Sequence, residues 1–195
     1  YCLRLPDGAV DVWALEAGYG SAERSPAQPH EQAERLQDLV LAWTGDPYAE
    51  VRDALWAAPE VARLAELRLA MVEAHAAAQA ALDNHAAVVR ALEPVVREHP
   101  AREAAACLLA SAHYRSGRQV AALDVLRRTT GYLVDELGLE PGRAVRDLER
   151  DILRQADHLE PIELEPVAVA PQHEVRTNTA LRGRTVELAE LSGAA

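Results

Sequence analysis

Apolar residues recur at intervals of three and four over much of the chain, which is the spacing of amphipathic α-helices. The segment 31–43 shows this pattern, and Gly45 and Pro47 then supply the residues that end a helix. Pro59 suits the first turn of a long helix that continues towards Leu82. Further helices with the same periodicity are predicted over 86–98, 101–115, 118–137 and 142–155.

The chain before these helices carries weaker signals. Residues 1–5 alternate between apolar and polar side chains, which predicts a short strand. Asp11 is a suitable N-cap for a helix that follows it. The stretch 21–30 contains Pro26 and Pro29 and is predicted to be a loop.

The composition changes again after Ala156. Prolines at 161, 166 and 171 interrupt the segment 157–180, which is expected to be an extended linker. A helical pattern then resumes in 181–195. The sequence therefore divides into a short N-terminal strand, a helical region over 10–156, a linker and a further segment.

Two consecutive helix pairs are similar when one is shifted by about 33 residues, close to the tetratricopeptide period. Small residues such as Gly117 and Ala122 stand where two paired helices have to approach closely. The shift aligns Ala77 with Ala110 and Val89 with Ala122. Val89 therefore stands where the repeat has a small residue. This pattern predicts an all-α fold, a tetratricopeptide-like helical superhelix of about three helix pairs plus a closing helix.

Composition agrees with close-packed helices and argues against direct DNA binding. Hydrophobic residues make up 49% of the chain, but aromatics only 4%, and phenylalanine is absent. The core must therefore consist of leucine, valine, alanine and isoleucine, of which alanine and leucine are strong helix formers. The net charge is −11, and all 20 basic residues are arginine. Because DNA affinity depends on neutralising phosphates, this chain alone is not expected to bind DNA well.

Five short motifs carry a family resemblance through their order and spacing. They are Val-Asp-Val-Trp at 10–13, Leu-Ala-Glu-Leu-Arg-Leu at 64–69, His-Pro-Ala-Arg-Glu at 99–103, Tyr-Arg-Ser-Gly-Arg-Gln at 114–119 and Glu-Leu-Gly-Leu-Glu-Pro-Gly at 136–142. Together they resemble the bacterial transcriptional activation domain of the SARP family, the Streptomyces antibiotic regulatory proteins. The resemblance covers residues 10–156, most of the chain.

The resemblance implies a transcriptional activator of secondary-metabolite clusters. In that family a winged-helix DNA-binding domain precedes this domain, so residues 1–9 would include the last strand of a truncated winged helix. The implied partners are RNA polymerase, the upstream winged-helix domain and a second protomer on DNA. DNA itself would be reached only through the upstream domain, so no residue of this chain is assigned to base contacts.

The tail adds a second resemblance. The run Leu-Arg-Gly-Arg-Thr-Val-Glu-Leu-Ala-Glu-Leu at 181–191 is similar to the entry of STAND-type ATPase domains, as in large SARP regulators. Here Arg182 replaces the usual valine and Thr185 the usual glutamate. Residues 181–195 are thus a candidate start of an ATPase domain. Because this chain contains no P-loop, no ATP and no other cofactor is expected to bind to it.

Four residues are candidates for interdomain or partner contacts. All three tryptophans, Trp13, Trp43 and Trp56, are expected to pack in the core or between domains, and the functional alternative is that Trp13 helps to seal the upstream domain against the first helices. The other candidates, Tyr114, Arg115 and Arg118, surround the turn between two paired helices: Tyr114 is expected to pack under it, and a role in a partner groove is the alternative. A generic tetratricopeptide-like adaptor that binds a peptide or regulatory ligand is the alternative function.

Signals for catalysis, metal binding and membranes are weak. The seven histidines form no HExxH motif, and His85, His99 and His113 are expected to be solvated or capping residues. Carboxylates are abundant, but none is placed in a converging acid–base pair, so no enzyme is expected. Cys2 and Cys107 are predicted to be reduced thiols of a cytoplasmic protein. The sequence contains no apolar run long enough to span a membrane.

Overall fold

The computed structural model describes residues 10–24, 28–51 and 54–156, and all regular structure within these ranges is helical. The all-α prediction is therefore confirmed. The predicted strand at 1–5, the linker at 157–180 and the segment 181–195 lie outside the described residues. The elements are α1 (Asp11–Arg24), α2 (Pro29–Ala42), the 3-10 turn η1 (Ala49–Val51), α3 (Ala58–Ala81), α4 (His85–Glu98), α5 (Glu103–Arg115), α6 (Gln119–Leu137) and α7 (Arg143–Leu153).

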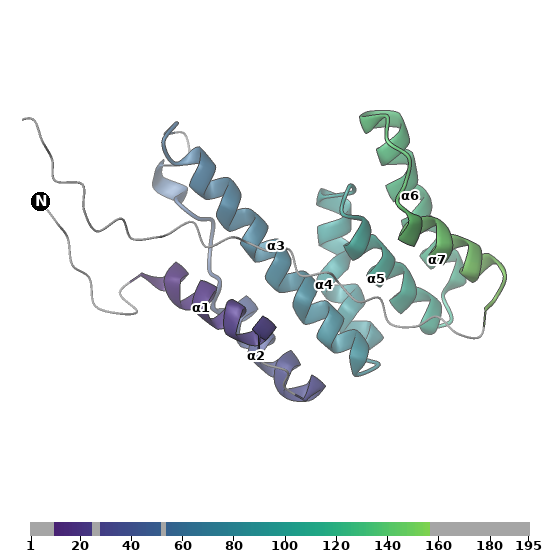
Figure 1. Ribbon diagram of the computed structural model, residues 1–195, viewed down its shortest axis with the longest axis horizontal. Helices are drawn as coiled ribbons and strands as arrows, with labels where there is room; N and C mark the ends of the chain where they lie inside the picture. Colours follow the sequence, from purple (N-terminus) through teal and green to yellow (C-terminus); the bar gives the residue numbers. More distant parts are fainter. Residues whose placement is uncertain (1–9, 25–27, 52–53, 157–195) are drawn as a thin grey trace, which may run out of the picture.

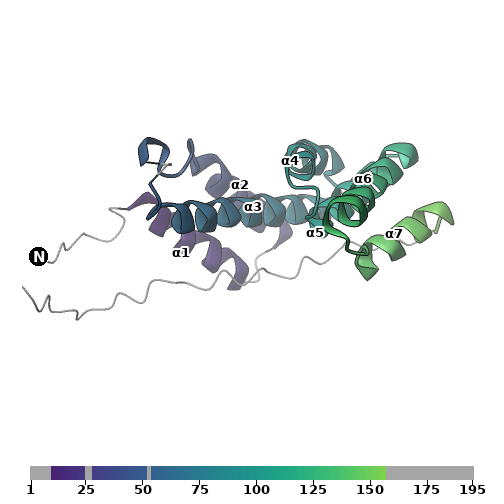
Figure 2. The same cartoon turned by 90° about the horizontal axis from the view of Figure 1, so that it is seen from above.

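The helices form three pairs, α1–α2, α3–α4 and α5–α6, and α7 closes the array (Figure 1). Each helix packs against the next one in the chain, and α5 also contacts α3 and α7. The view from above shows α3, the longest helix, running from the α1–α2 end of the molecule towards α5 (Figure 2). This is the arrangement of stacked helical repeats, in which a repeat contacts only its neighbours.

The two central pairs repeat at a shift of 34 residues, one more than the sequence alignment indicates. Helices α3 and α5 end at Ala81 and Arg115, and α4 and α6 begin at His85 and Gln119. The turn residues agree, because Asp83 and Gly117 both have left-handed backbones, with φ of 54° and 74°. The equivalent of Ala110 is therefore Ala76, and all of both side chains is buried. Val88, not Val89, occupies the position of Ala122, and it too is completely buried.

The core has two parts that meet along α3. The first part joins α1 and α2 to the α3 residues between Leu64 and Ala78, around Tyr19, Leu36, Leu67 and Met71. The second joins the C-terminal end of α3 to α4, α5, α6 and α7, and consists almost entirely of alanine, valine and leucine side chains. Because α3 supplies residues to both parts, it sets the position of the α1–α2 pair relative to the rest of the molecule.

Partly buried ion pairs reinforce this junction. Arg102, which precedes α5, donates hydrogen bonds to Glu66 and Glu73 of α3, and the Glu73 side chain is only 8% exposed. Arg63 of α3 likewise bonds to Glu60 and to Glu16 of α1. Hydrogen bonds to these carboxylates hold the pKa of both arginines above its usual value. The charges therefore tie α3 to α1 on one side and to the start of α5 on the other.

Helix α7 closes the second core. Its apolar residues Val145, Leu148 and Ile152 are buried, while its opposite face carries arginines and carboxylates. The Gly142 N–H that precedes it donates to Glu103 Oε2 at 2.6 Å. A polar outer face on a last helix is what a stack of repeats needs where it meets solvent.

The first helix pair is more regular than the sequence predicts. Helix α1 continues through Gly18 and Gly20 to Arg24, and α2 begins at Pro29, so the loop predicted over 21–30 is too long. A Cβ on Gly18 would lie 2.7 Å from Leu39 Cδ2 of α2, so glycine permits the close approach of these two helices. The prolines mark only the short connection between helices, because Pro29 is tolerated in the first turn of α2.

Candidate interaction surfaces

Large apolar side chains are exposed near the start of α1 and in the connection between α2 and α3. Trp13 is 40% exposed, Leu55 is 92% exposed and Trp56 is 69% exposed. The ring of Tyr48 stands edge-on to Trp56, with centroids 6.1 Å apart. Exposed aromatic groups of this kind favour contact with a partner. Within the described residues, Trp43 packs against the first core and Trp13 and Trp56 do not, so packing between domains stays a prediction for these two residues.

A cavity of about 370 Å³ lies beside these residues. It is lined by Val10 and Val12 at the start of α1, by Trp43 and Tyr48 after α2, and by Leu64 of α3. The described chain begins at its edge. Its apolar lining can accept a side chain from whatever packs against this end of the domain.

A second, larger hollow follows the seam between α1 and α2, with a volume of about 620 Å³. Residues spaced by three and four on both helices line it, among them Leu15 and Gly18 of α1 and Leu39 of α2. The sequence pattern does not predict this hollow, because the hollow depends on how α1 and α2 pack against each other. The repeated small side chains of α1 were the available signal.

The other three candidate residues lie together, at the turn between α5 and α6. Tyr114 is half-buried against the second core, as expected for a residue that packs under the turn. Arg115 Nη1 lies 3.5 Å from Asp83 Oδ1 and so links this turn to the one between α3 and α4. The Arg118 backbone N–H donates to the His113 carbonyl at 2.9 Å. Trp13 belongs to the first helix pair, so the four residues do not form one site.

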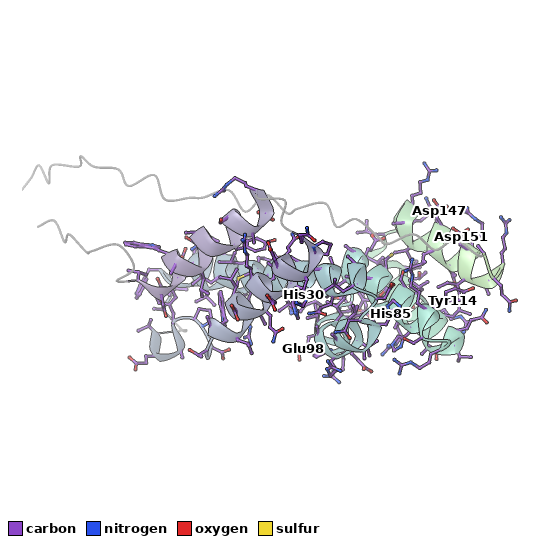
Figure 3. All side chains as sticks on the ribbon, turned by 90° about the horizontal axis from the view of Figure 1, so that it is seen from below. His30, His85, Glu98, Tyr114, Asp147 and Asp151 are labelled. Atoms are coloured by element: carbon purple, nitrogen blue, oxygen red, sulfur yellow. The ribbon has the colours of Figure 1, made fainter. Side chains whose placement is uncertain are left out.

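The histidines do not converge. No group of three or more His, Cys, Asp or Glu residues within the described ranges could hold a metal ion. The two histidines labelled in Figure 3 belong to different helices, His30 to α2 and His85 to the start of α4. The prediction that His113 is solvated or capping is wrong, because it is 6% exposed. Burial, together with the nearby Arg118, lowers the pKa of His113.

Cys107 is a buried free thiol at the centre of the second core. Burial raises its pKa to about 12, so the reactive thiolate is scarce at neutral pH. The residue packs as a small apolar side chain. Helices in the described part of the chain are also too short or too polar to cross a membrane.

The charge is unevenly distributed along the array. Residues 10–51, which contain α1 and α2, carry eight carboxylates against two arginines, a net charge of −6. Residues 85–156, which contain α4 to α7, carry eleven arginines against ten carboxylates, a net charge of +1. The first helix pair is therefore the acidic end of the domain, and Trp13, Tyr48 and the two hollows described above lie at this end.

Comparison with known proteins identifies relatives over the same helical region. A family profile described as the bacterial transcriptional activator domain matches residues 10–153. The transcriptional regulatory protein EmbR of Mycobacterium tuberculosis is 34% identical over 157 residues, which cover 80% of this chain and 40% of EmbR. The regulatory protein DnrI of Streptomyces peucetius is 31% identical over 156 residues, which cover 79% of this chain and 57% of DnrI.

A solved structure supports the same relationship. The structure of M. tuberculosis EmbR in complex with a low-affinity phosphopeptide superposes with a TM-score of 0.72 at 31% identity, and the match covers 84% of this chain and 42% of EmbR. This chain thus spans about half the length, or less, of these two relatives. Both relatives are named as regulators, EmbR as a transcriptional one, and not as enzymes.

Proposed function

The chain belongs to the bacterial transcriptional activator domain family of SARP-type regulators, and on that premise we propose that it couples a DNA-binding domain to the transcription machinery. It is a transcription-regulator domain and not an enzyme. In the proposed role the helical array binds proteins, and DNA is reached only through another domain. The regulator would act in the cytoplasm on genes of secondary metabolism.

The concentration of exposed aromatic and apolar groups at the first helix pair supports the proposal best. Trp13, Leu55 and Trp56 stand in solvent where the described chain begins, beside a cavity edged by Val10. A domain that packs here would cover these side chains and remove their apolar surface from water. We assign this end to an upstream winged-helix domain, whose last strand would fall in residues 1–9.

The rest of the array is assigned to partners beyond that domain. The turn between α5 and α6 presents Arg115 and Arg118 beside the half-buried Tyr114. This turn is a candidate contact for a second protomer on DNA, since aromatic residues and arginine are enriched in protein interfaces. Residues 157–180 would then be a linker to an ATPase domain that begins in 181–195.

An in-frame deletion tests the proposal. We expect a regulator that lacks residues 10–156 to lose promoter activation while its DNA-binding domain still occupies the promoter. The measurement is a promoter–reporter assay together with promoter occupancy in the same cells. Activation that survives the deletion would contradict the coupling role.

The alternative is a tetratricopeptide-like adaptor that binds a peptide, and the hollow between α1 and α2 favours it. An adaptor needs no DNA-binding domain. Sequencing the gene over about 100 codons upstream, the usual size of a domain, separates the two functions. A helix-turn-helix with a basic recognition helix supports the activator, and its absence supports the adaptor.

A further inference from the structure

The seam between α1 and α2 forms a groove with an apolar floor. Leu15 and Gly18 of α1 face Leu39 of α2, and exposed Ala14 and Ala42 widen the opening. Gly18 keeps the floor open, because it presents no side chain to the groove. The hollow measures about 620 Å³, which is room for several apolar side chains.

The spacing of the lining suits a helical occupant. On α1 the lining residues recur at intervals of three and four from position 11 to position 22, and on α2 they do so from 35 to 42. The lining spans 12 residues of α1 and eight of α2, or about 18 Å and about 12 Å at 1.5 Å per residue. A helix of three to four turns can place one row of apolar side chains along a groove of this length.

The lining of the groove carries a net charge of −1, from two carboxylates and one arginine. Asp11 and Asp38 line it, Arg35 is the one arginine among the lining residues of this hollow, and Glu34 is exposed on the same helix. The whole segment 10–51 carries a net charge of −6. A partner that neutralises this surface must be basic, since complementary potentials steer encounter and fix register.

The remaining parts of this chain do not supply that charge. Residues 157–195 carry seven carboxylates against three arginines, a net charge of −4. Residues 1–9 carry Arg4 and Asp7, which cancel. A second copy of the chain would bring the same acidic pair of helices to the groove. Residues 1–9, residues 157–195 and the acidic helix pair of a second copy therefore do not supply a basic partner for the groove.

We propose that the groove between α1 and α2 binds a basic amphipathic helix of a partner protein, with its apolar face on Leu15, Gly18 and Leu39 and its arginines or lysines against Asp11 and Asp38. This inference rests on the proposed function and deepens it, because it names the chemistry of the partner that the domain receives. It also places that partner on the first helix pair, separate from the turn at Tyr114.

A peptide titration tests the groove. The probe is a fluorescein-labelled peptide of the same length as α1, with leucines spaced by three and four and arginines elsewhere. One comparison peptide replaces the leucines with serine, and another replaces the arginines with glutamate. Measured by fluorescence polarisation on the whole 195-residue chain, the first peptide should bind at least about tenfold more tightly than either comparison peptide. Equal binding of the serine peptide would show charge attraction alone and overturn the proposal.

Matched variants locate the binding. Ala14→Arg puts a long cation into the groove, and Asp38→Arg reverses a lining charge, so each should weaken the probe about tenfold. Ala144→Arg on α7 and Glu136→Arg on α6 make the same changes at exposed positions far along the chain and should have no effect. Unchanged binding by both groove variants, with melting curves like the parent chain, would place the site elsewhere and overturn the proposal.

A cross-linking measurement distinguishes the occupants. A photo-reactive amino acid at position 14 in the chain, irradiated with purified RNA polymerase holoenzyme, should join a basic helix of the polymerase. Cross-links to residues 157–195 or to a second copy would overturn the assignment to a partner.

If the peptide does not bind but deletion of 10–156 still abolishes activation, only this inference fails. If the peptide binds but the deletion leaves activation intact, the proposed function fails instead.

Discussion

At the scale of single residues, Arg102 connects the two parts of the core. Its guanidinium reaches Glu73, whose side chain is 8% exposed, and also Glu66, whose side chain is 57% exposed. A carboxylate as buried as Glu73 is costly unless a cation accompanies it. Arg102 therefore holds the start of α5 against α3 and fixes the angle between the first helix pair and the remainder.

Replacing this arginine should destabilise the domain strongly. We expect Arg102→Ala to lower the free energy of unfolding by about 3 kcal/mol, because Glu73 is left buried without its partner. Urea denaturation followed by circular dichroism measures the change. Arg143→Ala is the matched control, since the Arg143 side chain is 89% exposed and pairs with Asp147 on the surface. The control should cost less than about 1 kcal/mol, and equal losses would contradict the role of Arg102.

His113 gives the fold a pH dependence of known sign. Burial first, and then the nearby Arg118, lower its pKa, so the folded protein keeps the ring neutral. Burial also lowers the pKa of His75. In the unfolded chain His113 binds a proton at about pH 6.5, whereas in the folded chain it does so only at lower pH. Its contribution to the unfolding free energy is therefore fully present above about pH 6.5 and is lost as the pH falls below that value.

The variant His113→Gln should therefore have a shallower decline of stability between about pH 7 and pH 5 than the parent chain. The measurement is the free energy of unfolding across that range. His30→Gln is the control, because the His30 side chain is 75% exposed. If the unfolding free energy changes with pH to the same extent in His113→Gln, in His30→Gln and in the parent chain, the burial of His113 does not cause the decline.

At the scale of elements, close contact between paired helices depends on small side chains. Ala110 of α5 and Ala122 of α6 are completely buried where these helices pack. The equivalent residues of the preceding pair, at a shift of 34, are Ala76 and Val88. The α3–α4 pair thus accommodates a valine at the position where α5–α6 has an alanine. The two pairs are equivalent in sequence position, but the residue between the helices differs in size.

Enlarging the small residue should separate α5 from α6. Ala122→Leu is expected to cost about 1–3 kcal/mol in unfolding free energy, because extra methylene groups have no space in a packed core. Val120→Leu on the same helix is the control, since Val120 is 73% exposed and should tolerate the change. Thermal melting measures both, and a melting temperature for Ala122→Leu equal to that of the control would contradict the assigned register.

Helical periodicity predicts most of the elements correctly, because buried positions on α3 to α7 are marked by apolar side chains at regular spacing. It misjudges α1, where Gly18 and Gly20 have low helix propensity but tertiary packing against Leu39 favours the helix. The repeat shift is also misjudged by one residue, because Asp83 replaces glycine at the left-handed turn position. The burial of His113 was not predicted, because the sequence alone does not show which side of α5 the neighbouring helices cover.

Candidate sites are predicted less completely than the fold. The turn at Tyr114 was found because its string Tyr-Arg-Ser-Gly-Arg-Gln carries the family resemblance. The groove between α1 and α2 was not found, because its lining consists of alanine, glycine and leucine, which resemble ordinary packing positions in a sequence. Only the relative placement of two helices turns such residues into an exposed surface.

At the scale of the whole molecule, the helical array is asymmetric. The first pair is acidic and carries exposed aromatic residues and two hollows, while the region from α4 to α7 is nearly neutral and closed by the polar face of α7. This uneven charge favours a basic partner at the first helix pair rather than at α4 to α7. It also disfavours direct contact with DNA phosphates, because the net charge of the chain is −11.

Binding of the 195-residue chain to RNA polymerase holoenzyme, measured by biolayer interferometry with promoter DNA as the parallel ligand, tests the coupling role most directly. The account predicts that the chain binds polymerase and does not bind promoter DNA, and that Asp38→Arg weakens the polymerase complex more than Glu136→Arg does. Binding to DNA without binding to polymerase, or binding to neither, would contradict it.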